Sequence, residues 1–126
     1  MRFCSIASGS SGNCIYVGSD NTHVLVDIGI SGKKMETGLN SLELTGRDLD
    51  GILITHEHSD HIKGLGVISR KYGIPIYATG GTVDAMMRTN ALGKIPEGIF
   101  HEIREDESFM INDLKVNPFT IPHDAA

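Results

Sequence analysis

The first quarter of the chain consists of short runs of strand-forming residues, separated by residues that favour turns. Three such runs, at residues 3–7, 14–17 and 23–28, are bounded by Gly, Ser, Asn or Asp, a pattern typical of neighbouring strands. Residues 19–21, with the sequence Ser-Asp-Asn, predict a hairpin turn between the second and third runs. The chain is therefore expected to begin with a strand meander.

The apolar pattern changes to helical spacing after these strands. Between residues 33 and 44, the side chains of Met35, Leu39 and Leu42 recur every three or four positions, which predicts an amphipathic helix. Gly46 is expected to end this helix. The apolar run at residues 51–55 then predicts a strand that is buried on both faces.

Helices and strands alternate in the middle of the chain. The first helix there is expected to end at Gly73, and its apolar face consists of Ile62, Leu65, Ile68 and Tyr72. A strand follows at residues 74–78. The next helix is expected to begin with Thr82 as its N-cap and to carry Val83, Met86 and Met87.

The last third of the chain returns to strand patterns. Strands are predicted at residues 98–103, 108–111 and 114–120, with the Asn-Asp pair at residues 112–113 turning between the last two. A meander, then alternating helices and strands, then further strands predict an α/β (α+β) fold. In such a fold, helices cover one side of a mixed sheet.

The composition is that of an ordinary globular protein: 126 residues, 40% hydrophobic, 21% charged, with a net charge of −5. This length suits one domain or part of a larger one. No apolar run approaches the ~18 residues that span a bilayer, and the first residues lack the core of a signal peptide, so we expect a cytoplasmic protein without membrane contact.

Cys4 and Cys14 are expected to be a reduced, buried pair. The mild acidity argues weakly against broad electrostatic binding of nucleic acid without excluding it.

A dense group of metal-binding residue types follows the apolar run at residues 51–54. Residues 55–61 have the sequence Thr-His-Glu-His-Ser-Asp-His, and imidazole and carboxylate are ligands of ions such as zinc or manganese. His56 and His58 are two residues apart, so an extended backbone points both rings to one side. Asp60 and His61 fall where the next helix begins. We interpret this group as a metal site, in preference to a polar loop with unrelated histidines.

Two further segments are candidates for the same site. Asp27 ends an apolar strand just before Gly29, from where it either supports the metal edge of the sheet or caps a turn. His123 follows the last predicted strand, beside Asp124, and is either an exposed loop residue or a further ligand. A metal bound by two histidines alone is under-coordinated, which favours the ligand role for His123.

The Ser- and Gly-rich loop at residues 8–13 has small side chains and backbone N–H groups that suit a phosphate. It lacks the Lys of a P-loop and does not lead into a helix, so a simple turn between two strands is the safer interpretation. If the turn reaches the metal edge, Ser10, Ser11 and Asn13 would line a substrate pocket. His23 and His101 stand alone on predicted strands and are expected to be structural or solvated.

The order and spacing of these motifs resemble the metallo-β-lactamase superfamily over essentially the whole chain. The motifs that carry the resemblance are Asp27-x-Gly29, His56-x-His58-x-Asp60-His61 and His123. Two shorter segments, Ala-Ser-Gly-Ser-Ser-Gly-Asn at residues 7–13 and Pro-His-Asp-Ala at residues 122–125, are similar to the branch of this superfamily called YycJ, WalJ or VicX.

This resemblance implies an αββα sandwich that binds two divalent metal ions, zinc or manganese, at the edge of its facing sheets. It assigns the first ion to His56, His58 and His123, the second to Asp60 and His61, and support of the ligand loop to Asp27. The family's later motifs add a bridging Asp and a final His, which have no counterpart in this sequence. Residues 1–126 are therefore expected to be the N-terminal portion of a single metallo-β-lactamase-like domain. The fold would be truncated after the first sheet and part of the second, with an incomplete second metal site.

Members of this branch are DNA-directed exonucleases, so the resemblance implies a metal-dependent phosphodiesterase that hydrolyses DNA with a metal-activated hydroxide. Asp60 is the candidate catalytic residue, because it can accept a proton from that water while it holds its ion. Two alternatives stay open. One is a thioester or lactam acyl hydrolase of the same superfamily, and the other is a metal-binding fragment without catalysis.

Overall fold

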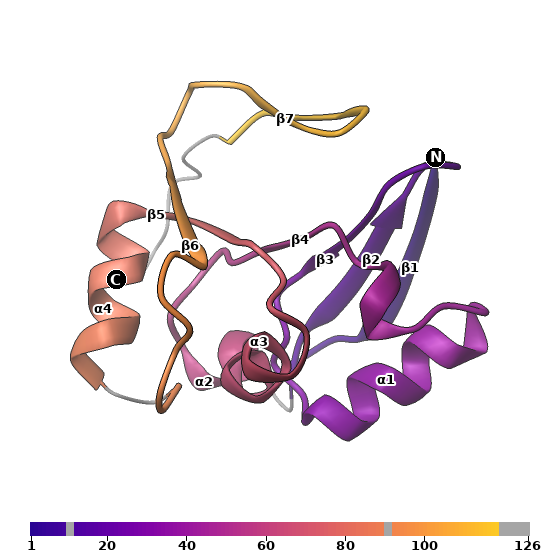
Figure 1. Cartoon of the computed structure of the whole chain (residues 1–126), viewed down its shortest axis with the longest axis horizontal. Helices are drawn as coiled ribbons and strands as arrows, with labels where there is room; N and C mark the ends of the chain where they lie inside the picture. The colour runs from indigo at the N-terminus through magenta and orange to yellow at the C-terminus, as the bar shows by residue number, and fades with distance from the viewer. Residues whose placement is uncertain (10–11, 90–91, 119–126) are drawn as a thin grey trace.

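The computed structural model describes residues 1–9, 12–89 and 92–118 of the chain. Figure 1 shows the order of the elements. Their bounds are β1 (Arg2–Ala7), β2 (Cys14–Gly18), β3 (His23–Val26), α1 (Gly32–Ser41), η1 (Gly46–Asp48), β4 (Gly51–Leu53), α2 (Ser59–Ile62), α3 (Leu65–Tyr72), β5 (Ile76–Thr79), α4 (Gly80–Thr89), β6 (Phe100–Ile103), β7 (Phe109–Ile111) and β8 (Leu114–Val116). None of the helices in the described ranges has the length and apolar character needed to span a membrane.

Six strands form one mixed sheet in the order β1-β2-β3-β4-β5-β6. β1, β2 and β3 pair in antiparallel fashion, which confirms the predicted meander. β3, β4, β5 and β6 are parallel to one another, and helical segments connect each parallel pair. The carboxyl ends of the parallel strands therefore meet at one edge of the sheet, which is where open α/β sheets commonly bind ligands.

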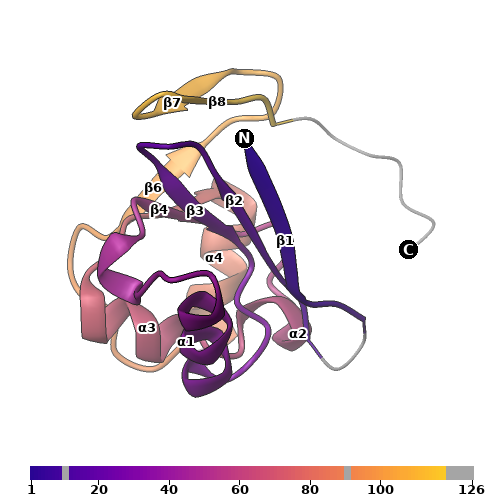
Figure 2. The same cartoon turned by 90° about the vertical axis from the view of Figure 1, so that its right-hand side faces the viewer.

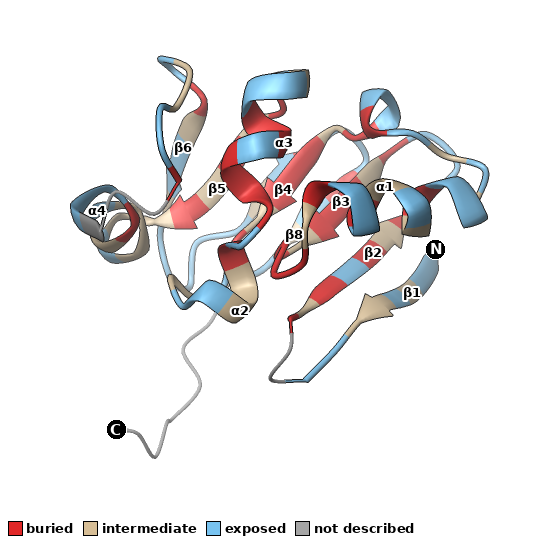
Figure 3. Ribbon diagram, turned by 90° about the horizontal axis from the view of Figure 1, so that it is seen from below, coloured by how far each residue is buried: buried red, intermediate tan, exposed pale blue. Residues whose placement is uncertain are grey.

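The two faces of the sheet are covered by different elements. α1, α3 and α4 pack on one face, where the main hydrophobic core contains the fully buried side chains of Leu25, Ile52 and Ile68. The hairpin of β7 and β8 packs on the other face through Ile111 and Leu114. Figure 2 shows this hairpin and the helices α1 and α3 on opposite sides of the sheet, and Figure 3 shows the buried stripe of α3. β4 lies between these layers, as its apolar run predicts.

Helix α1 begins where the sequence predicts but ends earlier. The Ser31 hydroxyl caps its N-terminus by accepting a hydrogen bond from the Lys34 N–H at 3.3 Å. The helix ends at Ser41, and Glu43 takes the left-handed conformation (φ 64°) beyond it. The prediction that Gly46 ends the helix is therefore wrong. Gly46 begins η1, and a side chain there would overlap the ring of Tyr72, so the glycine permits close packing instead.

The predicted helix after the histidine segment is divided into α2 and α3. Gly64 lies at the break, where a side chain would overlap the Ile30 carbonyl oxygen. Gly73, in the left-handed conformation, ends α3 as predicted. Thr82 is not the N-cap of the next helix, because α4 already begins at Gly80. Thr79, one position before α4, accepts the hydrogen bond from the Thr82 N–H through its hydroxyl at 3.4 Å.

Asp113 fastens the β7–β8 hairpin to the first sheet. Its carboxylate accepts hydrogen bonds from the hydroxyl of Ser19, at 2.9 and 3.0 Å, and from the hydroxyl of the buried Thr22. Both donors belong to the turn between β2 and β3. The bonds from Thr22 and Ser19 lower the pKa of the Asp113 carboxyl below its ordinary value of 3.8, because they favour the ionised form.

We expect Asp113→Ala to lower the melting temperature by a few degrees at most at pH 7, because the Asp113 carboxylate and its hydrogen bonds from Ser19 are exposed to solvent. A carboxyl whose pKa is lowered in the folded state stabilises the protein above its ordinary pKa of 3.8. This contribution is lost as the pH falls through the lowered value. The difference between wild type and Asp113→Ala should therefore shrink in thermal melts below pH 3.8. Asp20→Ala in the same turn is the control, and a difference independent of pH would contradict the assignment.

Candidate metal centre

Three imidazole rings gather where the chain leaves β4 and enters α2. The ring centroids of His56 and His58 are 6.0 Å apart, and those of His56 and His61 are 4.8 Å apart. His58 has extended backbone angles and immediately precedes α2. The structure thus brings three of the predicted site residues together at the carboxyl edge of the parallel strands.

Asp27 joins the end of β3 to this group through its buried side chain, which is 6% exposed. Oδ1 accepts a hydrogen bond from the Thr55 N–H at 2.8 Å, and Oδ2 accepts from the Thr55 hydroxyl at 2.7 Å. Oδ2 also lies 2.7 Å from Nδ1 of His61. An ionised carboxylate only accepts, so Nδ1 carries the hydrogen and Nε2 of His61 is left as the basic nitrogen.

The backbone of Asp27 is itself unusual, with a φ of 63° in the left-handed region. Aspartate is one of the few residues other than glycine that adopts this conformation at modest cost. The bend turns the carboxylate from the end of β3 toward the segment that follows β4. Asp27 therefore does more than cap its own turn, since all three of its side-chain partners come from Thr55 and His61.

Asp60 completes the described part of the group. Its Oδ2 lies 3.7 Å from Nε2 of His61, and its side chain is 35% exposed. Asn13, from the loop before β2, approaches the same oxygen at 3.5 Å through its side-chain amide. The loop after β1 therefore does reach the edge of the sheet where the histidines lie. Ser10, Ser11, His123 and Asp124 lie outside the described residues.

Thr55 is a residue of this network to which sequence reasoning gave no role. Besides its two bonds to Asp27, its hydroxyl lies 3.0 Å from Nδ1 of His56 and 3.4 Å from Nδ1 of His61. It links the buried carboxylate to both rings. The available signal was its position directly before the histidine segment, where a hydroxyl can donate one hydrogen bond and accept others.

The remaining histidines have other surroundings. His23 contacts the hydroxyl of Tyr16 at 2.5 Å through Nδ1. His101 is exposed and stacks on Tyr77 with ring centroids 5.1 Å apart. These surroundings fit the prediction that both histidines are structural or solvated.

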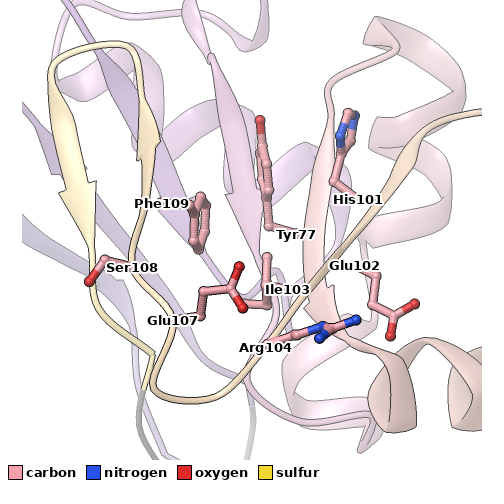
Figure 4. Close-up of a pocket in the computed structure, with 8 residues that line it drawn as sticks. All are labelled: Tyr77, His101, Glu102, Ile103, Arg104, Glu107, Ser108 and Phe109. Carbon is pink, nitrogen blue, oxygen red and sulfur yellow. The ribbon is translucent and has the colours of Figure 1, made fainter.

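A separate pocket of about 270 Å³ lies between β6 and the β7–β8 hairpin. Figure 4 shows the rings of Tyr77, His101 and Phe109 along it, with the charged side chains of Glu107 and Arg104 nearby. Tyr77 stacks on Phe109 with centroids 5.3 Å apart, on the hairpin side of the sheet. No residue of the histidine segment lines this pocket, so it is distinct from the candidate metal centre.

The two cysteines are both free, as predicted, although only Cys14 is fully buried. Burial, together with the negative charge of Asp27, raises the pKa of the Cys14 thiol to about 12. A thiol with this pKa is not a nucleophile near neutral pH. Cys14 is therefore a core residue beside the site rather than part of its chemistry.

The donor types of this group fit a divalent ion, since imidazole and carboxylate ligands suit zinc and manganese alike. Within residues 1–9, 12–89 and 92–118, however, no three His, Cys, Asp or Glu side chains converge into a complete metal-binding group. The assignment of this group as a candidate metal centre therefore depends on the chemistry of the side chains and on their proximity.

Comparison with known proteins identifies the family. The model of the metallo-beta-lactamase superfamily matches residues 7–122. The chain belongs to this superfamily. Membership implies divalent metal ions, usually zinc. Rm3 metallo-beta-lactamase has the same fold, with a TM-score of 0.68 at 21% sequence identity over 90% of this chain and 46% of that chain. The prediction of a metallo-β-lactamase fold is thus confirmed.

The curated relatives include two exodeoxyribonucleases. The chain is 45% identical to exodeoxyribonuclease YycJ of Bacillus anthracis, over 100% of this chain and 47% of the relative. It is 42% identical to exodeoxyribonuclease WalJ of Streptococcus pneumoniae, over 99% of this chain and 46% of the relative. The resemblance to this branch is confirmed, and the chain spans about half the length of these relatives.

Asp27→Ala should lower the free energy of unfolding by about 3–5 kcal/mol, because it removes the acceptor of three hydrogen bonds and places alanine in a left-handed conformation. Asp27→Asn keeps a residue that tolerates this conformation and an oxygen for the Thr55 N–H, so it should cost clearly less. Urea unfolding monitored by circular dichroism compares the two. Equal stability of the alanine variant and wild type would refute the role of this network.

Iodoacetamide labelling tests the burial of Cys14. At pH 8 a thiol with a pKa of about 12 has only about one part in 10,000 as thiolate. We expect the native protein to take up one label, at the half-buried Cys4, and the urea-unfolded protein to take up two. Rapid double labelling of the native protein, measured by mass spectrometry, would contradict this environment.

Proposed function

We propose that this chain belongs to a metal-dependent phosphodiesterase that degrades DNA as an exodeoxyribonuclease. The observation that carries the proposal is the group of His56, His58, Asp60 and His61 at the sheet edge, in which Thr55 contacts His56 and Asp27 contacts His61. The family relation favours a hydrolase that uses divalent metal ions. The identities of 45% and 42% to two exodeoxyribonucleases favour DNA over other substrates.

The proposed ligand set follows the positions of the donors. His56 and His58, whose rings are neighbours, would hold the first ion together with His123. Asp60 and His61 would hold the second ion, and the 3.7 Å between Asp60 Oδ2 and His61 Nε2 supports their pairing. Zinc and manganese both suit these donors. Asp60 and His61 are fewer ligands than a zinc ion usually takes, so occupancy of the second site would need further donors.

In metal-dependent phosphodiesterases, bound divalent ions lower the pKa of a water molecule and stabilise negative charge on the phosphoryl oxygens. The residues of this chain would contribute orientation and proton transfer. Asp27 holds Nδ1 of His61, which presents Nε2 toward Asp60. Asp60, whose side chain is partly exposed to solvent, would accept a proton from an attacking water. The Thr55 hydroxyl contacts Nδ1 of His56 and would help to orient its ring.

The test is cleavage of end-labelled DNA by the product of the complete reading frame, with added manganese or zinc. His58→Ala and Asp60→Ala should each reduce the rate at least about 100-fold, because metal stabilisation of the transition state amounts to several kcal/mol. His101→Ala is the matched control, since this histidine is exposed on β6 and stacks on Tyr77 beside the separate pocket. Undiminished cleavage by His58→Ala and Asp60→Ala would refute the proposal.

A substrate panel separates this activity from acyl hydrolysis by the same residues. The panel contains labelled DNA, bis-p-nitrophenyl phosphate, a thioester and a β-lactam, each with and without EDTA. EDTA-sensitive turnover of DNA is the expected result. Turnover of the thioester or lactam without DNA cleavage would replace the nuclease by an acyl hydrolase. Metal binding without any turnover would leave a binding module.

A further inference from the structure

Asn13 contacts Asp60 through both its backbone and its side chain. Its backbone N–H donates to the Asp60 carbonyl oxygen at 2.8 Å, and its side-chain amide Nδ2 donates to the same oxygen at 3.1 Å. Nδ2 also lies 3.5 Å from the carboxylate oxygen Oδ2 of Asp60. Within its own loop, Asn13 accepts a hydrogen bond from the Gly9 N–H at 3.2 Å and donates to the Gly9 carbonyl at 3.1 Å.

The Asp60 carbonyl depends on these bonds because α2 ends too soon to supply one. In a continuous helix, the N–H of Gly64 would donate to the carbonyl of Asp60. Here the Gly64 N–H donates to the Ile28 carbonyl at 2.9 Å instead. α2 has only four residues, and His58 provides no side-chain cap for it. A helix this short has little stability of its own, so its orientation is set by contacts from outside.

A glycine brings the third segment of this junction into place. The Gly29 N–H, in the loop after β3, donates to the Asn13 carbonyl at 2.8 Å. A side chain at Gly29 would overlap the Asp60 carbonyl oxygen. The backbones of the three segments therefore meet here so closely that only glycine fits at this position. Asn13 lies at the centre of this junction, with its amide directed at the Asp60 side that faces His61.

We propose that Asn13 is a positioning residue for the second divalent ion, acting by fixing the peptide and the carboxylate of Asp60. The inference rests on the proposed function only for the assignment of Asp60 and His61 as ligands. Groups that orient metal ligands commonly change metal affinity by about 10- to 100-fold when they are removed. The bond from the Asn13 backbone remains in any variant, so the effect of the side chain is separable from the fold of the loop.

Two substitutions separate the amide donor of Asn13 from its amide oxygen. Asn13→Ala removes every side-chain contact. Asn13→Asp keeps the shape and the acceptor for the Gly9 N–H, but it replaces the amide donor to Asp60 and to the Gly9 carbonyl with a carboxylate oxygen. If the donor matters, the Asp variant should be at least as impaired as the Ala variant. Asn21→Ala, in the exposed turn at the other end of β2, is the matched control.

Zinc is titrated into the metal-free product of the complete reading frame against a chromophoric competing chelator. We expect wild type and Asn21→Ala to bind two ions. Both Asn13 variants should bind the first ion normally and the second about 10- to 100-fold more weakly, with melting temperatures near that of wild type. Wild-type or tighter binding of the second ion by Asn13→Asp would overturn the inference. So would equal weakening of both ions, which indicates a general structural effect.

DNA cleavage measured on the same samples separates this inference from the proposed function. Two bound zinc ions without DNA cleavage in wild type would refute the nuclease proposal, while the zinc affinities would still decide the role of Asn13. DNA cleavage by wild type together with normal zinc binding in both Asn13 variants would refute the positioning role alone. A wild-type protein that binds fewer than two ions would overturn both.

Discussion

The buried carboxylate of Asp27 is the constraint on which the candidate metal centre depends. A charged group inside a protein is tolerated only when hydrogen-bond donors surround it. The donors of Asp27 come from Thr55 and His61, both in the segment that follows the neighbouring strand β4. Satisfying this one carboxylate therefore fixes the path of the histidine segment. It also selects which nitrogen of His61 is basic, so a structural requirement and a chemical one are met by the same bonds.

Close backbone contacts also hold the loops of the candidate metal centre together. Asn13, Gly29 and Asp60 bring together the loop after β1, the loop after β3 and the start of α2. Such contacts have little tolerance, because a single added carbon at Gly29 would overlap a carbonyl oxygen. Ligands of a metal ion must be held within about 0.5 Å of their productive positions, and closely packed backbone segments restrict movement of this kind. The short helix α2 thus gains from its surroundings the fixed geometry that its length cannot provide.

The layers of the fold place these loops at a common edge. The parallel pairing of β3 and β4 aligns the ends of two strands that are far apart in sequence, and Asp27 and Thr55 meet there. The β7–β8 hairpin on the opposite face is fastened at the other end of the sheet, where Asp113 binds Ser19 and Thr22. The chain belongs to the metallo-beta-lactamase superfamily and shares 45% and 42% of its sequence with two exodeoxyribonucleases. These relations support the interpretation of the common edge as a metal centre.

The sequence by itself determined the mixed sheet, the strand meander and the density of metal-binding residues at 56–61, because these follow from local patterns of apolar and polar residues. Its errors concerned Gly46 and Thr82, where a local rule for helix ends competed with packing against Tyr72 and with an earlier cap at Thr79. Only the tertiary structure showed that Asp27 contacts Thr55 and His61, that Thr55 contacts His56, and that Asn13 contacts Asp60. Those contacts join residues up to 47 positions apart. Pairing between distant segments depends on which strands are neighbours, and no local pattern contains that information.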